Sequence, residues 1–167
     1  GTVVWFGQAK DGGVWYCGVE VKDYQFSDGD RPQAPELVSI DGRFKAGVEG
    51  AKPGIIFPAR PVVGQTYLEE FSLANAEDTA QVFSTTYSYG ENQELDRFVP
   101  RQLAQLLCNH NCVVTENVSL LEPGIAERKY YTPGIGFFLE TNPDTGAVVS
   151  QLVTCNFDRR CASLPRP

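Results

Sequence analysis

Residues 2–21, TVVWFGQAKDGGVWYCGVEV, give the clearest fold signal in the chain. Both ends of this stretch are rich in aromatic and β-branched residues that alternate, a pattern typical of β-strands. The Asp-Gly-Gly at 11–13 between them has the composition of a tight turn, because glycine accepts the positive φ that hairpin turns require. The stretch therefore predicts a β-hairpin, in which alternation places Cys17 on the same face as Trp15 and Val19, pointing inward.

The rest of the chain repeats this pattern of short strands and turn residues. Only residues 100–107 (PRQLAQLL) predict a helix, with proline in the first turn and leucines on one stripe. A second hairpin is expected around residues 41–42, and the proline-rich stretch 50–64 is expected to be an irregular crossover. Further strands are expected at 66–73, 79–89, 112–120, 125–131, 134–141 and 147–157.

Short strands at this spacing favour a single type of architecture. We predict a mostly β fold, in which an antiparallel meander forms a half-barrel or barrel-like curved sheet with one short helix near 100–107. The length of 167 residues suits one domain, which we place at residues 1–157, followed by a C-terminal tail at 158–167.

Charge and hydropathy exclude several classes of partner. The net charge is −7 at pH 7 and the basic residues are scattered, so the surface repels phosphate backbones and nucleic acid is not expected to bind. The longest apolar runs fall far short of the roughly 20 residues that a membrane-spanning helix needs. No transmembrane segment is predicted.

The cysteines indicate the compartment. Four of the five lie in two close groups, which is typical of disulfides in an oxidising environment. The sequence begins with Gly-Thr and contains no methionine, as expected of a processed product, and Asn117 begins an Asn-Val-Ser glycosylation pattern. We therefore expect a secreted protein, extracellular or periplasmic. The disulfide candidates are Cys108, Cys112, Cys155 and Cys161.

Residues 108–112, Cys-Asn-His-Asn-Cys, form the sharpest local cluster and contain the only histidine. Cys108, His110 and Cys112 could bind zinc or copper together with a carboxylate. Zinc thiolates usually have C-x-x-C spacing, however, so a loop closed by disulfides is favoured. No catalytic residue is predicted, because a nucleophilic triad would have to use His110 and the G-x-S-x-G elbow is absent.

Acidic residues leave two alternatives open. One is a calcium site in a glycine-containing region, although solvated loop acids are the simpler interpretation; its acids are Asp23, Asp28, Asp30, Glu36 and Asp41. The other is general acid-base chemistry, which is disfavoured for neighbouring acids on a strand because they point to opposite faces. The carboxylates considered for it are Glu69 with Glu70, Glu77 with Asp78, Glu116, Glu122 and Glu127.

Aromatic residues occur in adjacent pairs, and on a strand each pair places one ring on each face. Outward rings could form a binding surface or an assembly contact, unless a second layer covers both faces. The residues of this predicted binding surface are Trp5, Trp15, Tyr16, Tyr130 and Tyr131.

Three stretches resemble a group of uncharacterised secreted bacterial β-rich proteins. Residues 14–20 (VWYCGVE) resemble the NVWYFGE segment of that group, and residues 44–55 (FKAGVEGAKPGI) resemble its WEAGVDGAxPGI segment. Residues 121–124 (LEPG) with 129–136 (KYYTPGIG) resemble its LEPG and KYYAPGVG segments. The resemblance implies a β-rich fold and secretion but no activity. Members of the group usually carry further β-rich sequence upstream, so an unpaired sheet edge, filled by another chain or a second copy, is expected here.

Together these features predict a secreted, disulfide-braced β module that acts in binding or extracellular assembly through sheet edges and exposed aromatics. Its expected partner is a protein or a second copy of itself. Two alternatives stay open: a small hydrolase-like or metal-assisted enzyme, and a carrier of a small hydrophobic ligand in a curved-sheet pocket. No cofactor is predicted, calcium and zinc being the alternatives.

Overall fold

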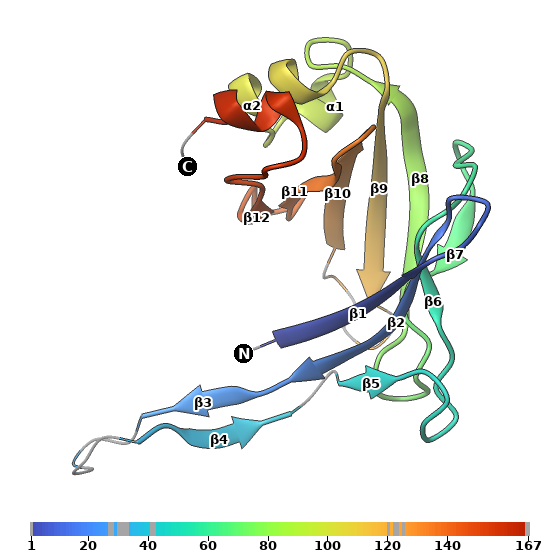
Figure 1. Ribbon diagram of the computed structural model, residues 1–167, viewed down its shortest axis with the longest axis vertical. Helices are drawn as coiled ribbons and strands as arrows, with labels where there is room; N and C mark the ends of the chain where they lie inside the picture. The colour runs from blue at the N-terminus through green and yellow to red at the C-terminus, as the bar shows by residue number, and fades with distance from the viewer. Residues whose placement is uncertain are drawn as a thin grey trace. The chain divides into compact units, whose positions relative to one another are not determined.

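The computed structural model describes residues 2–26, 29, 34–40, 43–119, 121, 124 and 126–165 (Figure 1). Its contacts divide the chain into two compact units. The first unit consists of Gly1–Arg60 and Tyr67–Thr79, and the second consists of Pro61–Thr66 and Ala80–Pro167. The prediction of one β domain over residues 1–157 stays a prediction.

The first unit is built on the hairpin that the sequence predicts. Strands β1 (Thr2–Gln8) and β2 (Val14–Val21) pair antiparallel, which confirms that hairpin. On its other side β2 pairs with β5 (Phe44–Lys45) and with β6 (Gly54–Phe57), which lies inside the expected crossover. The sheet therefore has the order β1-β2-β5, with β6 also on β2.

A β-bulge in β2 interrupts the side-chain alternation that the sequence predicts. The register shifts so that Trp5 lies opposite Gly18 and Phe6 lies opposite Tyr16, which leaves Cys17 as an extra residue. Because a bulge moves one residue out of the alternation, the buried face changes along the strand. Tyr16 is buried, Cys17 is only partly buried and Trp15 is exposed. The prediction that Cys17 points inward beside Trp15 is therefore wrong.

Strands β3 (Asp23–Gln25) and β4 (Glu36–Ser39) form a separate two-stranded sheet. Since β4 pairs with β3 and β5 pairs with β2, the hairpin expected around residues 41–42 is not formed by these strands. Residues 41 and 42 themselves lie outside the described residues.

The larger sheet confirms the predicted antiparallel meander. Its order is β12-β11-β10-β9-β8-β7, so every strand neighbours the next one along the chain. Among the described residues it does not close into a barrel. The strands are β7 (Thr66–Leu68), β8 (Asp78–Tyr87), β9 (Cys112–Ser119), β10 (Ala126–Thr132), β11 (Gly136–Thr141) and β12 (Val148–Gln151).

Short helices contribute to the core of the second unit. The predicted helix is confirmed as α2 (Arg101–Leu107), which Pro100 precedes. The sequence did not predict α1 (Gln93–Asp96), and part of the expected tail forms a 3-10 helix, η1 (Arg159–Ser163). The core joins helical to strand residues: Leu95, Leu103, Ala104 and Leu107 with Val114, Tyr130, Phe138 and Leu139. No helix in the described part of the chain is long and apolar enough to span a membrane.

Candidate functional site

Strand β1 lies at the edge of its sheet. Within the residues that the structure describes, β2 is the only strand that pairs with it. Its sequence, TVVWFGQ, contains no charged side chain. Large apolar side chains are exposed on both of its faces: Val3 55%, Val4 39%, Trp5 40% and Phe6 57%. An edge with open backbone donors and acceptors and an apolar surface is a template for pairing with another strand.

The ring of Trp5 is held in place at this edge. A Cβ atom at Gly18 would lie 3.4 Å from Cε3 of Trp5, so the indole packs against a bare backbone. The same Cβ would lie 2.7 Å from the carbonyl oxygen of Phe44, which only glycine avoids. The Lys45 ammonium lies 5.9 Å from the centre of the Trp5 ring, a cation–π contact. The exposed ring is therefore in contact with both the backbone and a cation.

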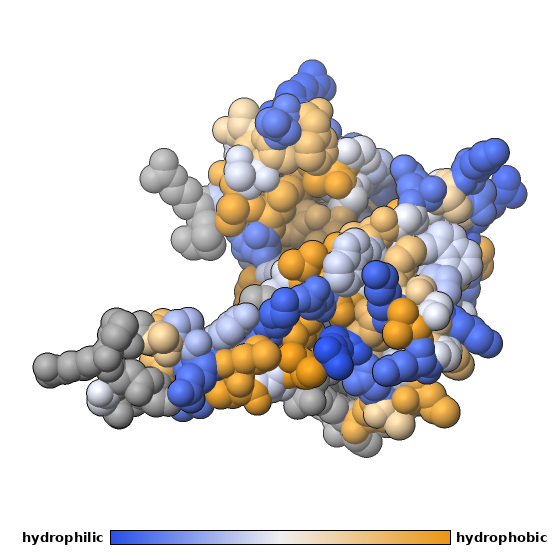
Figure 2. All heavy atoms as spheres, turned by 60° about the horizontal axis from the view of Figure 1, so that its bottom comes forward, coloured by the Kyte–Doolittle hydropathy of each residue, from blue (hydrophilic) through white to orange (hydrophobic). Residues whose placement is uncertain are grey.

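Further apolar side chains of the first unit reach the surface on β3, β4 and the residue after β3. Figure 2 shows hydrophobic residues (orange) at the surface of the molecule among hydrophilic residues (blue). Exposed side chains of this kind can be covered by a partner. They are Tyr24, Phe26, Leu37 and Val38, each more than half exposed.

Of the predicted binding surface, the structure exposes Trp5 and Trp15 and buries the three tyrosines. Tyr16 packs against Phe44 with ring centres 5.1 Å apart. Tyr130 is 1% exposed and Tyr131 is 5% exposed, so all three are core residues rather than surface residues. Adjacent aromatics do alternate between faces, but in this protein both faces of β10 are buried at these positions, which sequence alternation alone cannot show.

Two predicted acids of the first unit, Glu69 and Glu70, act electrostatically on the Tyr16 hydroxyl. Burial raises the pKa of Tyr16, and the charge of Glu70, to which the phenol is hydrogen bonded, raises it further. Glu69, 3% exposed, acts on it in the same direction. Strand β7 ends at Leu68, so the expected opposite-face alternation does not apply to these two glutamates. They hold a buried tyrosine neutral.

The disulfide candidates form two disulfides. Cys108 bonds to Cys112 and Cys155 bonds to Cys161, while Cys17 is a free thiol. Both sulfurs beside His110 are therefore used, and neither is a thiolate that could bind zinc or copper. The expectation of a loop closed by a disulfide is confirmed.

The remaining residues of this loop have ordinary partners. His110 is exposed, adopts a positive φ of 52°, and its Nδ1 lies 3.1 Å from Oε1 of Glu91. In the described ranges, no group of three or more His, Cys, Asp or Glu side chains could hold a metal ion.

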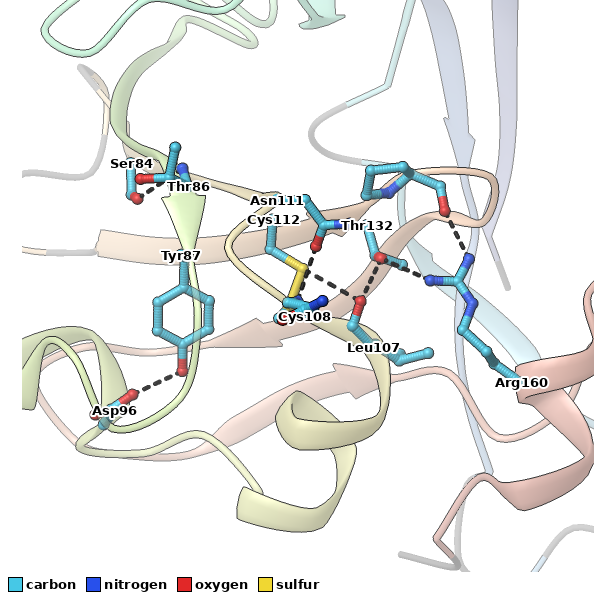
Figure 3. The surroundings of a disulfide bond; sticks show 12 residues. Ser84, Thr86, Tyr87, Asp96, Leu107, Cys108, Asn111, Cys112, Thr132 and Arg160 are labelled. Atoms are coloured by element: carbon cyan, nitrogen blue, oxygen red, sulfur yellow. Dashed lines mark hydrogen bonds between the residues drawn. A yellow bond between two sulfur atoms is a disulfide. The ribbon is translucent and has the colours of Figure 1, made fainter.

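A hydrogen-bond network fixes the disulfide-bonded end of α2 (Figure 3). The Leu107 carbonyl accepts from Oγ1 of Thr132 at 2.6 Å, and Nη1 of Arg160 donates to that Oγ1 at 3.2 Å. Nη2 of Arg160 donates to the Pro133 carbonyl at 2.6 Å. Asp158 accepts from the same guanidinium, whose hydrogen bonds lower the pKa of Asp158 to about 2. All these groups satisfy one another, so the network is structural.

Glu116, one of the acids considered for catalysis, is the partner of a buried arginine. Arg128 is 6% exposed and its Nε donates to Oε2 of Glu116 at 3.0 Å. Its Nη1 donates to the Glu94 carbonyl at 3.2 Å, and its guanidinium carbon lies 5.6 Å from the centre of the Phe83 ring. Arg128 thus joins β9, β10 and α1.

Glu127 belongs to a group of polar side chains on the opposite face of β10. A cross-strand row runs through Thr115, Lys129, Glu140 and Ser150, which face one another in register. The Nζ of Lys129 lies 3.8 Å from Oε2 of Glu127, and Oγ of Ser150 donates to Oε2 of Glu140 at 3.1 Å. Glu140, from β11, lay outside the predicted acids, because only the register brings it beside Glu127.

The two carboxyl groups are hydrogen bonded to each other. Burial, the hydrogen bond to Glu140 and the charge of Glu140 together raise the pKa of Glu127 to about 7, and Lys129 opposes the shift. Carboxyl groups of glycosidases stand about 5 Å or more apart to admit a sugar or a water. A hydrogen-bonded pair is closer than that, so Glu127 and Glu140 are not arranged as such a dyad.

Most of the acids considered for a calcium site are not described by the structure. Asp28, Asp30, Asp41 and Glu122 lie outside the described residues. Of the two that are described, Asp23 pairs with Ser39 and Glu36 pairs with Gln25, at opposite ends of the β3–β4 sheet. The calcium alternative stays a prediction.

Glu77 is a turn residue, since its Oε1 accepts from the Ala74 amide at 2.7 Å. Asn117, the predicted glycosylation residue, lies within β9 and is 2% exposed, and its glycosylation stays a prediction.

The candidate site is therefore the edge formed by β1, with Trp5 and Trp15 as its exposed aromatics. The resemblance to secreted bacterial β-rich proteins stays a prediction. The chain matches no family model, no curated protein and no solved structure.

Proposed function

We propose that this protein is a secreted, disulfide-braced β module that binds a β-strand of another polypeptide chain along β1. The observation that supports this most directly is the combination of an open backbone edge with side chains exposed on both faces of the strand. Strand addition takes its affinity from main-chain hydrogen bonds and its specificity from the alternating side chains. Val3 and Trp5 would contact the incoming strand on one face, and Val4 and Phe6 on the other.

The side chains of β1 favour a strand that pairs with a partner over a strand edge that stays exposed to solvent. Proteins that leave an edge exposed usually protect it with lysine, proline or an inward-pointing charge. None of these occurs between Thr2 and Gln8. The Trp5 ring, which already packs against Gly18 and contacts Lys45, adds a large contact area of the kind that aromatic anchors at interfaces supply.

Secretion is part of this proposal, and the two disulfides support it because such bonds persist in oxidising compartments. We also propose that the chain is related to the secreted bacterial proteins that it resembles. Alkylation of freshly isolated, denatured protein should label one thiol, that of Cys17. Labelling of five thiols would remove this support.

The strand-binding proposal can be tested with one matched pair of variants. Val3→Lys places a charge on β1, whereas Val63→Lys places the same charge on a residue outside any strand that is similarly exposed, 60% against 55%. Sedimentation velocity over a wide concentration range measures self-association, and native mass spectrometry of protein isolated from its source measures a bound partner. We expect association that Val3→Lys weakens at least tenfold and Val63→Lys leaves unchanged.

Two results would contradict this function. One is a chain that stays an 18.4 kDa monomer in both measurements. The other is a complex that Val3→Lys and Val63→Lys affect equally, since that complex would not use β1.

A further inference from the structure

The polar row on the second unit places two carboxyl groups beside one lysine. Glu140 lies directly opposite Lys129 in the register of β10 and β11, and Glu127 lies two residues before Lys129 on the same face. Lys129 approaches Glu127 at 3.8 Å, while Glu140 accepts a hydrogen bond from Ser150 at 3.1 Å. Two negative charges on these acids would exceed the one positive charge in the row.

The side chains of β9 next to Glu127 and Lys129 are buried. Asn117, its direct partner across the strands, is 2% exposed, and Thr115, the partner of Lys129, is fully buried. The Thr115 hydroxyl has no hydrogen-bond partner among the described atoms. The Glu127 side chain is itself 36% exposed, so its charge keeps part of its solvation, and it is the hydrogen-bonded Glu140 beside it that makes ionising both acids costly.

We propose that Glu127 and Glu140 share one proton, and that this pair makes the second unit less stable as the pH rises through neutrality. In the described strands that flank Glu127, the facing charged or titratable groups are Lys129 on β10 and Glu140 on β11. Asn117 of β9 and Ser150 of β12 do not titrate. The pair is thus a pH-sensitive element built into the sheet.

The direction of the effect follows from proton linkage. Near pH 6 the folded pair holds a proton that an unfolded glutamate, with its ordinary pKa of 4.5, has already lost. Stability therefore declines as the pH rises from about 4.5 through the folded pKa of about 7, and the contribution of the proton is lost above that.

Carboxyl carbon NMR on the intact protein tests the pair directly. We expect one glutamate to titrate with a midpoint near pH 7. Glu140→Gln should lower that midpoint by removing the second charge, and Lys129→Met should raise it by removing the nearby cation. A midpoint that neither variant moves, or no glutamate titrating above pH 6, would overturn the proposal.

Thermal unfolding provides the second measurement and does not depend on resonance assignment. The decrease in Tm between pH 5.5 and pH 8 should become smaller in Glu127→Gln, whereas the exposed control Glu49→Gln should keep the decrease of the unmodified protein. Equal decreases in both variants would contradict the proposal. If Glu127→Gln does not fold, Glu140→Gln gives the same comparison from the other side of the pair.

Discussion

Gly54 shows how one missing side chain determines the structure of the first unit. A Cβ atom at this position would overlap the carbonyl group of Glu69, so the two backbone segments touch. Only glycine permits such an approach between β6 and a segment much later in the chain. The sequence showed Gly54 as one residue of a stretch rich in proline and glycine. It could not show the contact, because the contacting group is brought there by the fold.

We predict that Gly54→Ala destabilises the first unit by about 3 kcal/mol, because the added methyl group forces the two backbone segments apart. Gly7→Ala is the matched control. Its Cβ would meet nothing closer than Sγ of Cys17 at 3.5 Å, an ordinary contact, and should cost within about 0.5 kcal/mol. Urea unfolding followed by tryptophan fluorescence measures both, since Trp5 and Trp15 lie in the first unit. Equal midpoints for the two variants would show that the segments are not in contact.

Among the helices and strands, α2 could be predicted from the sequence and α1 could not. Helix α2 has a leucine stripe long enough to recognise, whereas α1 has four residues and is defined by its cap: Oδ1 of Asn92 accepts from the amides of Glu94 and Leu95 at 3.0 and 3.2 Å. Local patterns gave the hairpin and the meander strands. The bulge at Cys17 and the pairing of β4 depend on contacts between distant residues, so alternation along one strand did not reveal them.

Arg128 joins two strands to α1 through its guanidinium. Arg128→Met should destabilise the second unit by about 3 kcal/mol, since it leaves the Glu116 carboxylate, 20% exposed, without its cation. The double variant with Glu116→Leu should recover part of the loss, because an apolar pair leaves no buried charge. Arg101→Met on the exposed side of α2 is the control. Chemical denaturation of the four proteins checks this, and a double variant no better than Arg128→Met would contradict it.

At the scale of the whole molecule, covalent bracing is uneven. Both disulfides lie in the second unit, and the first unit holds the free thiol of Cys17. Closing loops this short contributes about 2 kcal/mol per disulfide by chain entropy. The secreted state that we propose therefore favours one half of the protein more than the other.

We predict that reduction and alkylation accelerate amide exchange at least tenfold in the strands of the second unit while leaving β1 and β2 unchanged. Hydrogen exchange with mass spectrometry resolves the two sets of peptides. The control is alkylation without reduction, which modifies Cys17 alone. Uniform acceleration throughout the chain would show that the disulfides stabilise both units.

The path of the backbone has a practical consequence for dissecting this protein. Tyr67–Thr79 returns to the first unit after the excursion through Pro61–Thr66, and it contributes both the Glu69 carbonyl and the buried side chain of Ala76. A stop codon after Arg60 would therefore give a fragment that lacks residues of its own hydrophobic core. Isolating the amino-terminal half requires grafting the returning segment onto it through an artificial linker, whereas one protease cut cannot separate the halves.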